Sequence, residues 1–355
     1  MSRRIDAATF ATTWLAPLLA LLIAAIVGDV LILSFGQSPG QVYRLLIDGT
    51  WGNAYGLGQV LYKATTLTFT GLAVALGLRA GLFNIGAEGQ LAAGGFAAAM
   101  AGLVLPAGTP LILAAPVCIV AAAAGGGVVG AVPGALKARF GASEVIVTIM
   151  LNFIVLAFLN WIVATKLHVG ESLHTPPINA GALPRLSDAA PAFHGSAANA
   201  TILLAIATAA AVGWFLFRTR AGYDVRATGL RPEAAEYGGI RVHREYFRAM
   251  TLAGALAGLG GVNYVLGYKQ YYEEGFAAGS GFLGIAVALV GRNHPAGVPL
   301  AALLFATISQ GGLAVNAIVP KQMVEVLTAV VILAVAATVP EVQRLVGAVT
   351  RRVTT

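Results

Sequence analysis

The stretch Gly81-Leu-Phe-Asn-Ile-Gly-Ala-Glu-Gly-Gln90 stands out from the rest of the chain. Of the 355 residues, 58% are hydrophobic and only 10% are charged, yet this block places Asn84, Glu88 and Gln90 close together. Apolar segments lie on both sides of it. An ionisable side chain at membrane depth is costly and therefore normally faces a cavity or a partner. The block is thus a candidate functional site.

Apolar runs long enough to cross about 30 Å of hydrocarbon recur along the whole chain. The sequence therefore predicts an all-α polytopic membrane protein, with residues 1–355 forming a single transmembrane domain. We expect about ten spans, of which the eighth is too short to cross alone and is either a half-helix or has misplaced ends. They cover residues 14–35, 57–78, 83–104, 109–136, 143–167, 200–217, 248–267, 281–291, 296–318 and 322–340.

The basic residues are distributed unevenly between the two sides of these spans. With the N-terminus in the cytoplasm, sixteen of the 22 basic residues fall inside and five outside, while Lys63 lies within a span. This asymmetry follows the positive-inside rule and predicts that the N- and C-termini are both cytoplasmic. Residues 168–199 then form an external loop, and residues 218–247 a polar, basic cytoplasmic loop. Topology explains the basic residues, so no nucleic acid partner is expected.

The cytoplasmic loop contains the sequence Ala227-Thr-Gly-Leu-Arg-Pro-Glu-Ala-Ala-Glu-Tyr-Gly-Gly-Ile240. Pro232 suits the first turn of a helix, where its missing N–H costs nothing. Glu233 in that turn favours the helix dipole, and Gly238-Gly239 can end the helix. The pattern predicts a short helix, which would be marginal on its own. Its own neighbours or another protein must therefore hold it in place.

This loop resembles the coupling loop of ABC-transporter permeases. Three further blocks, Gly81–Gln90, Glu144–Asn152 and Gly284–Pro295, resemble the nucleoside-type branch of the ribose/nucleoside importers, in the same order along residues 60–340. Branched-chain amino-acid permeases carry a block related to Phe83-Asn84, but the Ala-Glu-Gly-Gln ending here favours the nucleoside-type group. The residues that match the coupling loop are Gly229, Pro232, Glu233, Ala234, Ala235, Tyr237, Gly238 and Ile240.

The resemblance implies one subunit of a bacterial ABC importer in the inner membrane, forming half of a pathway for nucleosides or similar small polar solutes. The short helix would dock on cytoplasmic ATPase subunits. A second permease is implied, with a heterodimer expected and a homodimer left open, together with an external solute-binding lipoprotein and membrane lipid. A sugar, a flavin or a branched-chain amino acid is an alternative solute. The residues placed near the translocation pathway are Asn84, Glu88, Gln90 and Asn152.

The chain carries no phosphate-binding loop, because none of its five lysines follows a glycine as that motif requires. We therefore expect no catalytic residue and no cofactor, with ATP bound by a partner subunit. No metal site is expected either. The external histidines His168, His174 and His194 lie in a loop that has no cysteine and no ligand spacing.

Glu88 leaves two other interpretations open. It could be a structural residue bonded to a neighbouring helix. It could instead be the proton or cation site of an ion-coupled secondary transporter, a different class of protein that needs no ATPase. Such transporters often contain inverted repeats. No convincing repeat relates the two halves of this chain, and the basic cytoplasmic loop would then have no explanation.

Overall fold

The computed structural model describes residues 22–23, 25–316, 318, 320, 322, 325–326, 328–330 and 332–333. These residues are helical apart from their connecting loops and three isolated β-bridges. They divide into two compact units, one formed by residues 1–56 and 307–355 and the other by residues 57–306.

The first unit contains the helix Ala25–Ser34, α2 (Pro39–Asp48), the start of α3 (Ala54–Arg79) and the end of α13 (Gly297–Val315). Ile32, Val42 and Val315 are buried together in this unit. The indole Nε1 of Trp51 donates a hydrogen bond of 3.2 Å to Oγ1 of Thr307. Apolar burial and this polar contact hold the two ends of the described chain to each other.

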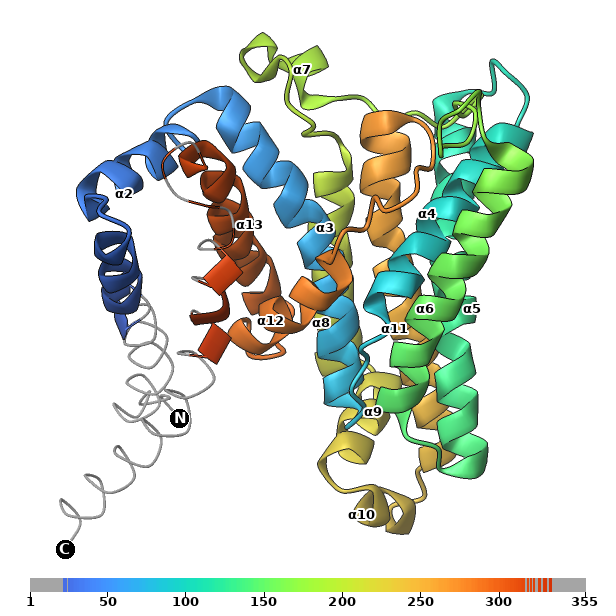
Figure 1. Cartoon of the computed structure of the whole chain (residues 1–355). Coiled ribbons are helices and arrows are strands. Elements are labelled where there is room, and N and C mark those ends of the chain that lie inside the picture. The colour runs from blue at the N-terminus through green and yellow to red at the C-terminus, as the bar shows by residue number, and fades with distance from the viewer. Residues whose placement is uncertain are drawn as a thin grey trace, which may run out of the picture. The chain divides into compact units, whose positions relative to one another are not determined.

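The second unit holds the other helices and is drawn in Figure 1. Two π-helical turns, η1 (Val163–Leu167) and η3 (Val265–Lys269), extend α6 and α11. Short helical turns, α7 (Leu186–Ala189) and η2 (Pro191–Phe193), lie between α6 and α8. The remaining helices are α4 (Ala87–Val104), α5 (Leu111–Phe140), α6 (Glu144–Ile162), α8 (Thr201–Arg218), α9 (Arg220–Leu230), α10 (Pro232–Tyr237), α11 (Val242–Tyr264) and α12 (Ser280–Val290).

Helices α4, α5 and α11 pack tightly against one another within the second unit. A Cβ atom added to Gly126 of α5 would collide with the carbonyl oxygen of Gly254 in α11, and one added to Gly254 would collide with that of Gly126. In lipid, small residues allow this close approach of helix backbones, and van der Waals packing then stabilises the pair. The many glycines of these helices are therefore part of the architecture.

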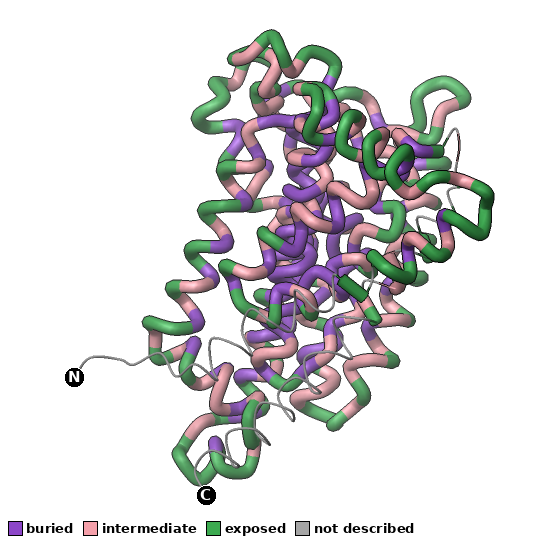
Figure 2. The backbone as a smooth tube through the Cα atoms, turned by 90° about the vertical axis from the view of Figure 1, so that its left-hand side faces the viewer, coloured by how far each residue is buried: buried purple, intermediate pink, exposed green. Residues whose placement is uncertain are grey.

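Helix α8 has one face that packs against the protein and another that is exposed and apolar. Its buried residues recur every three or four positions, which places them on one face of the helix. The exposed positions are apolar as well, among them Leu203, Ile206 and Trp214. Alternating buried and exposed turns are visible along the outer helices in Figure 2. A helix that is apolar on its exposed side is suited to contact lipid. The buried positions of α8 are Thr201, Ala205, Ala209, Val212 and Leu216.

Six of the described helical segments are long and apolar enough to cross a membrane. A seventh and an eighth apolar helix, Ala25–Ser34 and α12, are shorter, so the expectation of a short helix at 281–291 is confirmed. The predicted spans 14–35 and 322–340 lie partly outside the described residues, and the count of ten stays a prediction. The six segments are Ala54–Arg79, Leu111–Phe140, Glu144–Leu167, Thr201–Arg218, Val242–Lys269 and Gly297–Val315.

The two long loops differ from the sequence-based expectation in detail. The 218–247 loop was expected to hold one short helix, yet it contains α9 as well as α10. Helix α9 includes two arginines, an aspartate and two glycines, which obscure its helical pattern. The 168–199 loop contains α7 and η2 although its proline-rich sequence shows no helical periodicity. Figure 1 shows α7 and α10 at opposite ends of the second unit, as expected for loops on opposite sides of a membrane.

Candidate functional site

The local sequence explains how α10 begins and ends. Arg231, in extended conformation at φ −155°, separates α9 from α10, and Pro232 opens the helix. At the other end the N–H of Ile240 donates to the carbonyl of Ala235 at 3.0 Å, and the N–H of Gly239 to that of Glu236 at 2.9 Å. These two bonds form a Schellman motif, which requires the left-handed conformation that Gly239 adopts at φ +83°.

Most of α10 faces away from the protein. Ala235 is buried, and Pro232 and Ile240 are half-buried, so these three residues hold the helix to its own chain. The side chain of Tyr237 is 97% exposed. A hollow of about 410 Å³ lies between α9 and α10 and is lined by residues of both helices, including Ala234 and Gly238. The predicted coupling residues on the exposed side are Glu233, Ala234, Tyr237 and Gly238.

Gly229 brings α9 against the loop that follows α3. A Cβ atom at Gly229 would collide with the carbonyl oxygen of Arg79 and would lie 2.7 Å from the backbone nitrogen of Gly81. Gly81 itself has φ +75°, which a glycine adopts without strain. The loop that carries α10 therefore touches the beginning of the Gly81–Gln90 block directly, through two glycine backbones.

Within that block, the side-chain amides of Asn84 and Gln90 form two hydrogen bonds with each other. Nδ2 of Asn84 donates to Oε1 of Gln90 at 2.8 Å, and Nε2 of Gln90 donates to Oδ1 of Asn84 at 3.1 Å. The same oxygen of Asn84 accepts the backbone N–H of Gly86. Both side chains are buried. The pair therefore folds the loop before α4 back onto the first turn of the helix.

Asn152 of α6 joins the same cluster from another helix. Its Oδ1 accepts the N–H of Gly89 at 2.9 Å, and its Nδ2 donates to the carbonyl of Ile85 at 2.8 Å. Asn152 is 2% exposed. Because a buried backbone group without a partner is costly, this one amide side chain fixes the start of α4 against α6.

Glu88 connects α4 to α12. Its Oε1 accepts the N–H of Gly279 at 2.7 Å and its Oε2 accepts the N–H of Gly281 at 2.6 Å. The first N–H groups of a helix have no partner within the helix, and a negative charge there interacts favourably with the helix dipole. Glu88 is 5% exposed, so it acts as a buried cap for α12. The structural interpretation of Glu88 is thus supported by its hydrogen bonds.

The structure therefore brings Asn84, Glu88, Gln90 and Asn152 together, but all four bond to groups of the chain itself. Their place near a translocation pathway stays a prediction. Among the described residues no group of three histidine, cysteine or carboxylate side chains could hold a metal ion.

Two sets of contacts were not predicted from the sequence. Gly279 and Gly281 bond to Glu88, and the only signal for them is the Gly-Ser-Gly sequence before the apolar run of α12. Asn263 lies in the apolar stretch of α11, where its Nδ2 donates to the carbonyl of Tyr62 at 2.9 Å and to Oγ1 of Thr66 at 2.8 Å. A lone asparagine in a membrane helix is itself a signal of an interhelical hydrogen bond.

Comparison with known proteins supplies the family. Residues 56–336 match the family model described as the permease component of branched-chain amino acid transport systems. This chain belongs to that permease family. As a member of a permease family with six apolar helices of spanning length, it is a multi-pass membrane protein and a transporter subunit.

The relatives of this permease refine the assignment. It is 36% identical over 336 residues to the guanosine ABC transporter permease protein NupP of Bacillus subtilis, covering 91% of this chain and 92% of the relative. It is 35% identical over 329 residues to the nucleoside ABC transporter permease protein NupB of Lactococcus lactis, covering 91% and 90%. The predicted resemblance to nucleoside-type ABC permeases is confirmed.

Other relatives include a permease named for a different solute and second permeases from the same two organisms. The glucose ABC transporter permease protein TsgB13 of Haloferax volcanii is 33% identical over 336 residues, covering 90% of this permease and 87% of the relative. B. subtilis and L. lactis each also have a second matching permease, NupQ at 30% and NupC at 27% identity. No solved structure gives a significant match.

Proposed function

We propose that this permease forms half of the translocation pathway of a bacterial ABC importer that takes up nucleosides or similar small polar solutes. The relatives named for guanosine and nucleosides, aligned over nine-tenths of the chain, support this solute class. The glucose permease relative keeps a sugar as the alternative, and a flavin or a branched-chain amino acid are further ABC-type alternatives.

The exposure of α10 is the observation that carries the coupling role. A six-residue helix is marginal in water, yet this one has a C-terminal Schellman motif, a buried anchor at Ala235 and a fully solvated Tyr237. An exposed aromatic side chain beside a hollow is typical of a protein-binding surface. We infer that Glu233, Ala234 and Tyr237 enter a cleft on a cytoplasmic ATPase subunit, which binds ATP in place of this chain.

The contacts of the second unit offer a continuous route from α10 to the membrane helices. Ala235 and Ile240 fix α10 beside α9, and Gly229 rests α9 on Gly81. The cluster of Asn84, Gln90 and Asn152 then links that loop to α4 and α6, and Glu88 links α4 to α12. Closure of the ATPase subunits would move α10 and, through these contacts, α4 and α12 as one body.

The partners and the topology complete the proposal. A second permease supplies the other half of the pathway, and the paired relatives of B. subtilis and L. lactis favour a different chain over a second copy. An external lipoprotein delivers the solute at the end of the molecule that carries the 168–199 loop. Both termini lie in the cytoplasm in this proposal, as the positive-inside distribution of basic residues indicates. The chain crosses the inner membrane with about ten spans.

An ion-coupled secondary transporter is the competing class, with Glu88 as its ion site. Both carboxylate oxygens of Glu88 are occupied by backbone N–H groups of α12. A proton on a lone pair that accepts one of these N–H groups would displace that hydrogen bond, and a cation bound between the two oxygens would compete with both. The geometry thus favours Glu88 as a structural cap within an ATP-driven importer.

The test combines co-purification with uptake. The full chain is tagged in its native membrane, and the Ala234→Arg/Tyr237→Ala variant is compared with the wild type for recovered ATPase subunits and for uptake of radiolabelled nucleoside. We expect both to be lost while the amount of membrane-inserted chain is unchanged. The Glu233→Arg/Gly238→Pro variant, which alters the same surface and the end of α10, should likewise abolish uptake with insertion intact. Tyr55→Ala, at an exposed tyrosine outside the coupling loop, is the matched control.

The outcomes of this test distinguish an ABC importer from an ion-coupled secondary transporter. An ATPase and a second permease recovered with the wild type support the importer, and recovery of a single permease species supports a homodimer. Full uptake by either α10 variant would contradict the assignment of α10 as the helix that couples the permease to the ATPase. Uptake without any ATPase but with a requirement for a proton or sodium gradient would favour the secondary transporter.

A further inference from the structure

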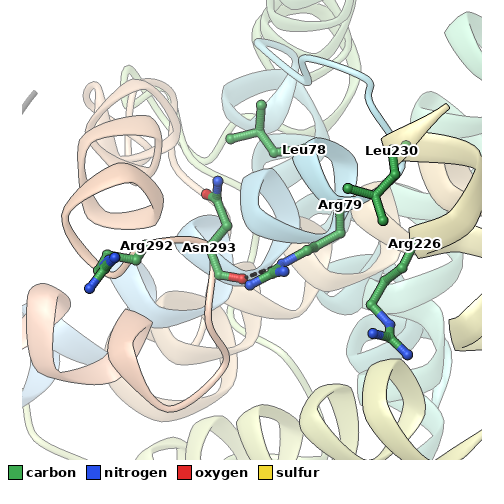
Figure 3. Close-up of a pocket in the computed structure, with 7 residues that line it drawn as sticks. Leu78, Arg79, Arg226, Leu230, Arg292 and Asn293 are labelled. Atoms are coloured by element: carbon green, nitrogen blue, oxygen red, sulfur yellow. Dashed lines mark hydrogen bonds between the residues drawn. The ribbon is translucent and has the colours of Figure 1, made fainter. Parts of the chain in front are cut away.

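A basic pocket lies where α3, α9 and the loop after α12 meet. Its volume is about 290 Å³, and Figure 3 shows the residues that line it. Arg79 extends from the end of α3 toward Asn293, with Arg226 of α9 on one side of it and Arg292 on the other. Nε of Arg79 donates to the carbonyl of Asn293 at 2.9 Å. The lining residues are Leu78, Arg79, Arg226, Gly229, Leu230, Arg292 and Asn293.

The charge of this pocket is not balanced by the chain. No carboxylate is among its lining residues, and none of the three arginines takes part in an ion pair within the described part of the chain. Nε of Arg226 is buried and has no hydrogen-bond partner. Guanidinium groups that are close together and unpaired repel each other, and an anion would remove that repulsion while accepting their N–H groups.

The backbone at one side of the pocket is in an unusual conformation. Arg292 and Asn293 have φ values of 55° and 51°, in the left-handed region that favours glycine. Strain of this kind persists only where the surroundings fix it, and it is often found at binding sites. Here it places the carbonyl of Asn293 on Arg79 and leaves the side chain of Arg292 at the pocket.

The pocket has apolar aromatic neighbours at the protein surface. The ring of Phe217 lies under two of the guanidinium groups, with the Cζ atoms of Arg226 and Arg79 at 5.2 and 5.8 Å from its centroid, and it stacks on His294. Phe217 and Leu230 are exposed, as is Trp214 one turn before Phe217. Aromatic side chains beside arginines are typical of the headgroup level of a membrane.

We propose that this pocket binds the phosphate of an anionic phospholipid headgroup. The three arginines supply charge and N–H donors for the phosphate, and the exposed Trp214, Phe217 and Leu230 contact the acyl chains next to it. Basic pockets between membrane helices hold anionic headgroups in this way. Because the pocket touches Arg79, Gly229 and the 292–293 turn, a bound lipid would join α3, α9 and α12 and stiffen their junction.

The experiment uses the full transporter, purified in detergent, stripped of lipid and supplied with phosphatidylglycerol or with phosphatidylcholine of the same acyl chains. Native mass spectrometry counts the lipid molecules retained. We expect selective retention of phosphatidylglycerol by the wild type and about tenfold or greater weakening in Arg226→Gln/Arg292→Gln, since each lost guanidinium removes charge-assisted hydrogen bonds. Arg226→Lys keeps the charge and should retain part of the binding.

The matched control is Arg220→Gln, an exposed arginine on the same helix that does not line the pocket, which should bind as the wild type does. Equal retention of the two lipids, or equal binding by the double variant and the wild type, would overturn the proposal. Competition by inorganic phosphate that is independent of acyl chains would assign the pocket to a soluble phosphate instead. Loss of the ATPase subunit from the double variant with lipid retention unchanged would also overturn it, in favour of an acidic protein partner.

Discussion

The backbone N–H of Gly281, at the start of α12, donates a 2.6 Å hydrogen bond to Oε2 of Glu88 in the first turn of α4. The two helix N-termini therefore meet at one carboxylate. A Cβ atom on Gly281 would collide with the backbone nitrogen of Glu88, so the two backbones approach as closely as atoms allow. This contact joins two residues that lie 193 positions apart in the sequence.

Replacing Glu88 should mainly lower the free energy of unfolding. It should have little effect on any dependence of uptake on an ion gradient. Glu88→Ala leaves the buried N–H of Gly281 without a partner, at a cost of about 1–3 kcal/mol, and also removes the hydrogen bond to the exposed Gly279. Glu88→Gln keeps one acceptor oxygen but places an NH₂ group against the second N–H, so we expect an intermediate loss. Thermal unfolding of the detergent-solubilised chain measures the effect.

The same pair of variants distinguishes a cap from an ion site. A cap predicts that stability and uptake decline together in the order wild type, Glu88→Gln, Glu88→Ala. If Glu88→Gln instead unfolded like the wild type, abolished uptake and removed its dependence on an ion gradient, Glu88 would be a coupling residue of a secondary transporter.

Gly281→Ala should destabilise the contact between α4 and α12. The added methyl group meets backbone atoms of Glu88, which cannot move aside as a flexible side chain could. We expect a cost at or above the roughly 1–3 kcal/mol typical of overpacking, seen as reduced membrane-inserted protein and a lower unfolding temperature. Gly213→Ala is the control, because its Cβ would lie 3.6 Å from Pro295 in ordinary contact and alanine favours helix α8. Equal behaviour of the two variants would contradict the close approach of α4 and α12.

Asn84 and Gln90 should be energetically coupled. They exchange two hydrogen bonds in a buried site, so Asn84→Ala and Gln90→Ala each leave one amide unpaired, and the double variant removes both. A double-mutant cycle on unfolding free energy should therefore give a coupling of about 0.5–3 kcal/mol, with the double variant less damaged than the sum of the single ones. Additive effects would mean that the two amides do not bond to each other.

The helices were predictable because their signals are local. Apolar length alone located the segments Leu111–Phe140 and Thr201–Arg218 to within a few residues. Pro232 and the Gly238-Gly239 pair located α10, since proline and glycine mark helix ends through backbone geometry. Helix α9 was missed because its charged residues and glycines lack a clear apolar face, and it is held by packing at Gly222 and Gly229 that the sequence does not display.

The site was predictable in its members but not in its contacts. Asn84, Glu88 and Gln90 stood out because polar side chains are rare in so apolar a chain. That Glu88 would cap α12 depends on a tertiary contact across 193 positions of sequence, which no local pattern encodes. The meeting of Arg79, Arg226 and Arg292 at one pocket is equally non-local, because each arginine alone resembles an ordinary basic residue of a helix or loop.

Gly229→Ala should separate ATPase binding from transport. Its added methyl group would collide with the carbonyl of Arg79 and push α9 away from Gly81, while the exposed residues of α10 stay unchanged. Overpacking of this kind costs about 1–3 kcal/mol, which need not unfold the chain. We therefore expect ATPase subunits to co-purify at wild-type levels while nucleoside uptake falls sharply. Gly213→Ala again serves as the control for a glycine substitution without collision. Normal uptake by Gly229→Ala in a chain that inserts normally would show that movement of α10 reaches α4 by another route than the Gly229–Gly81 contact.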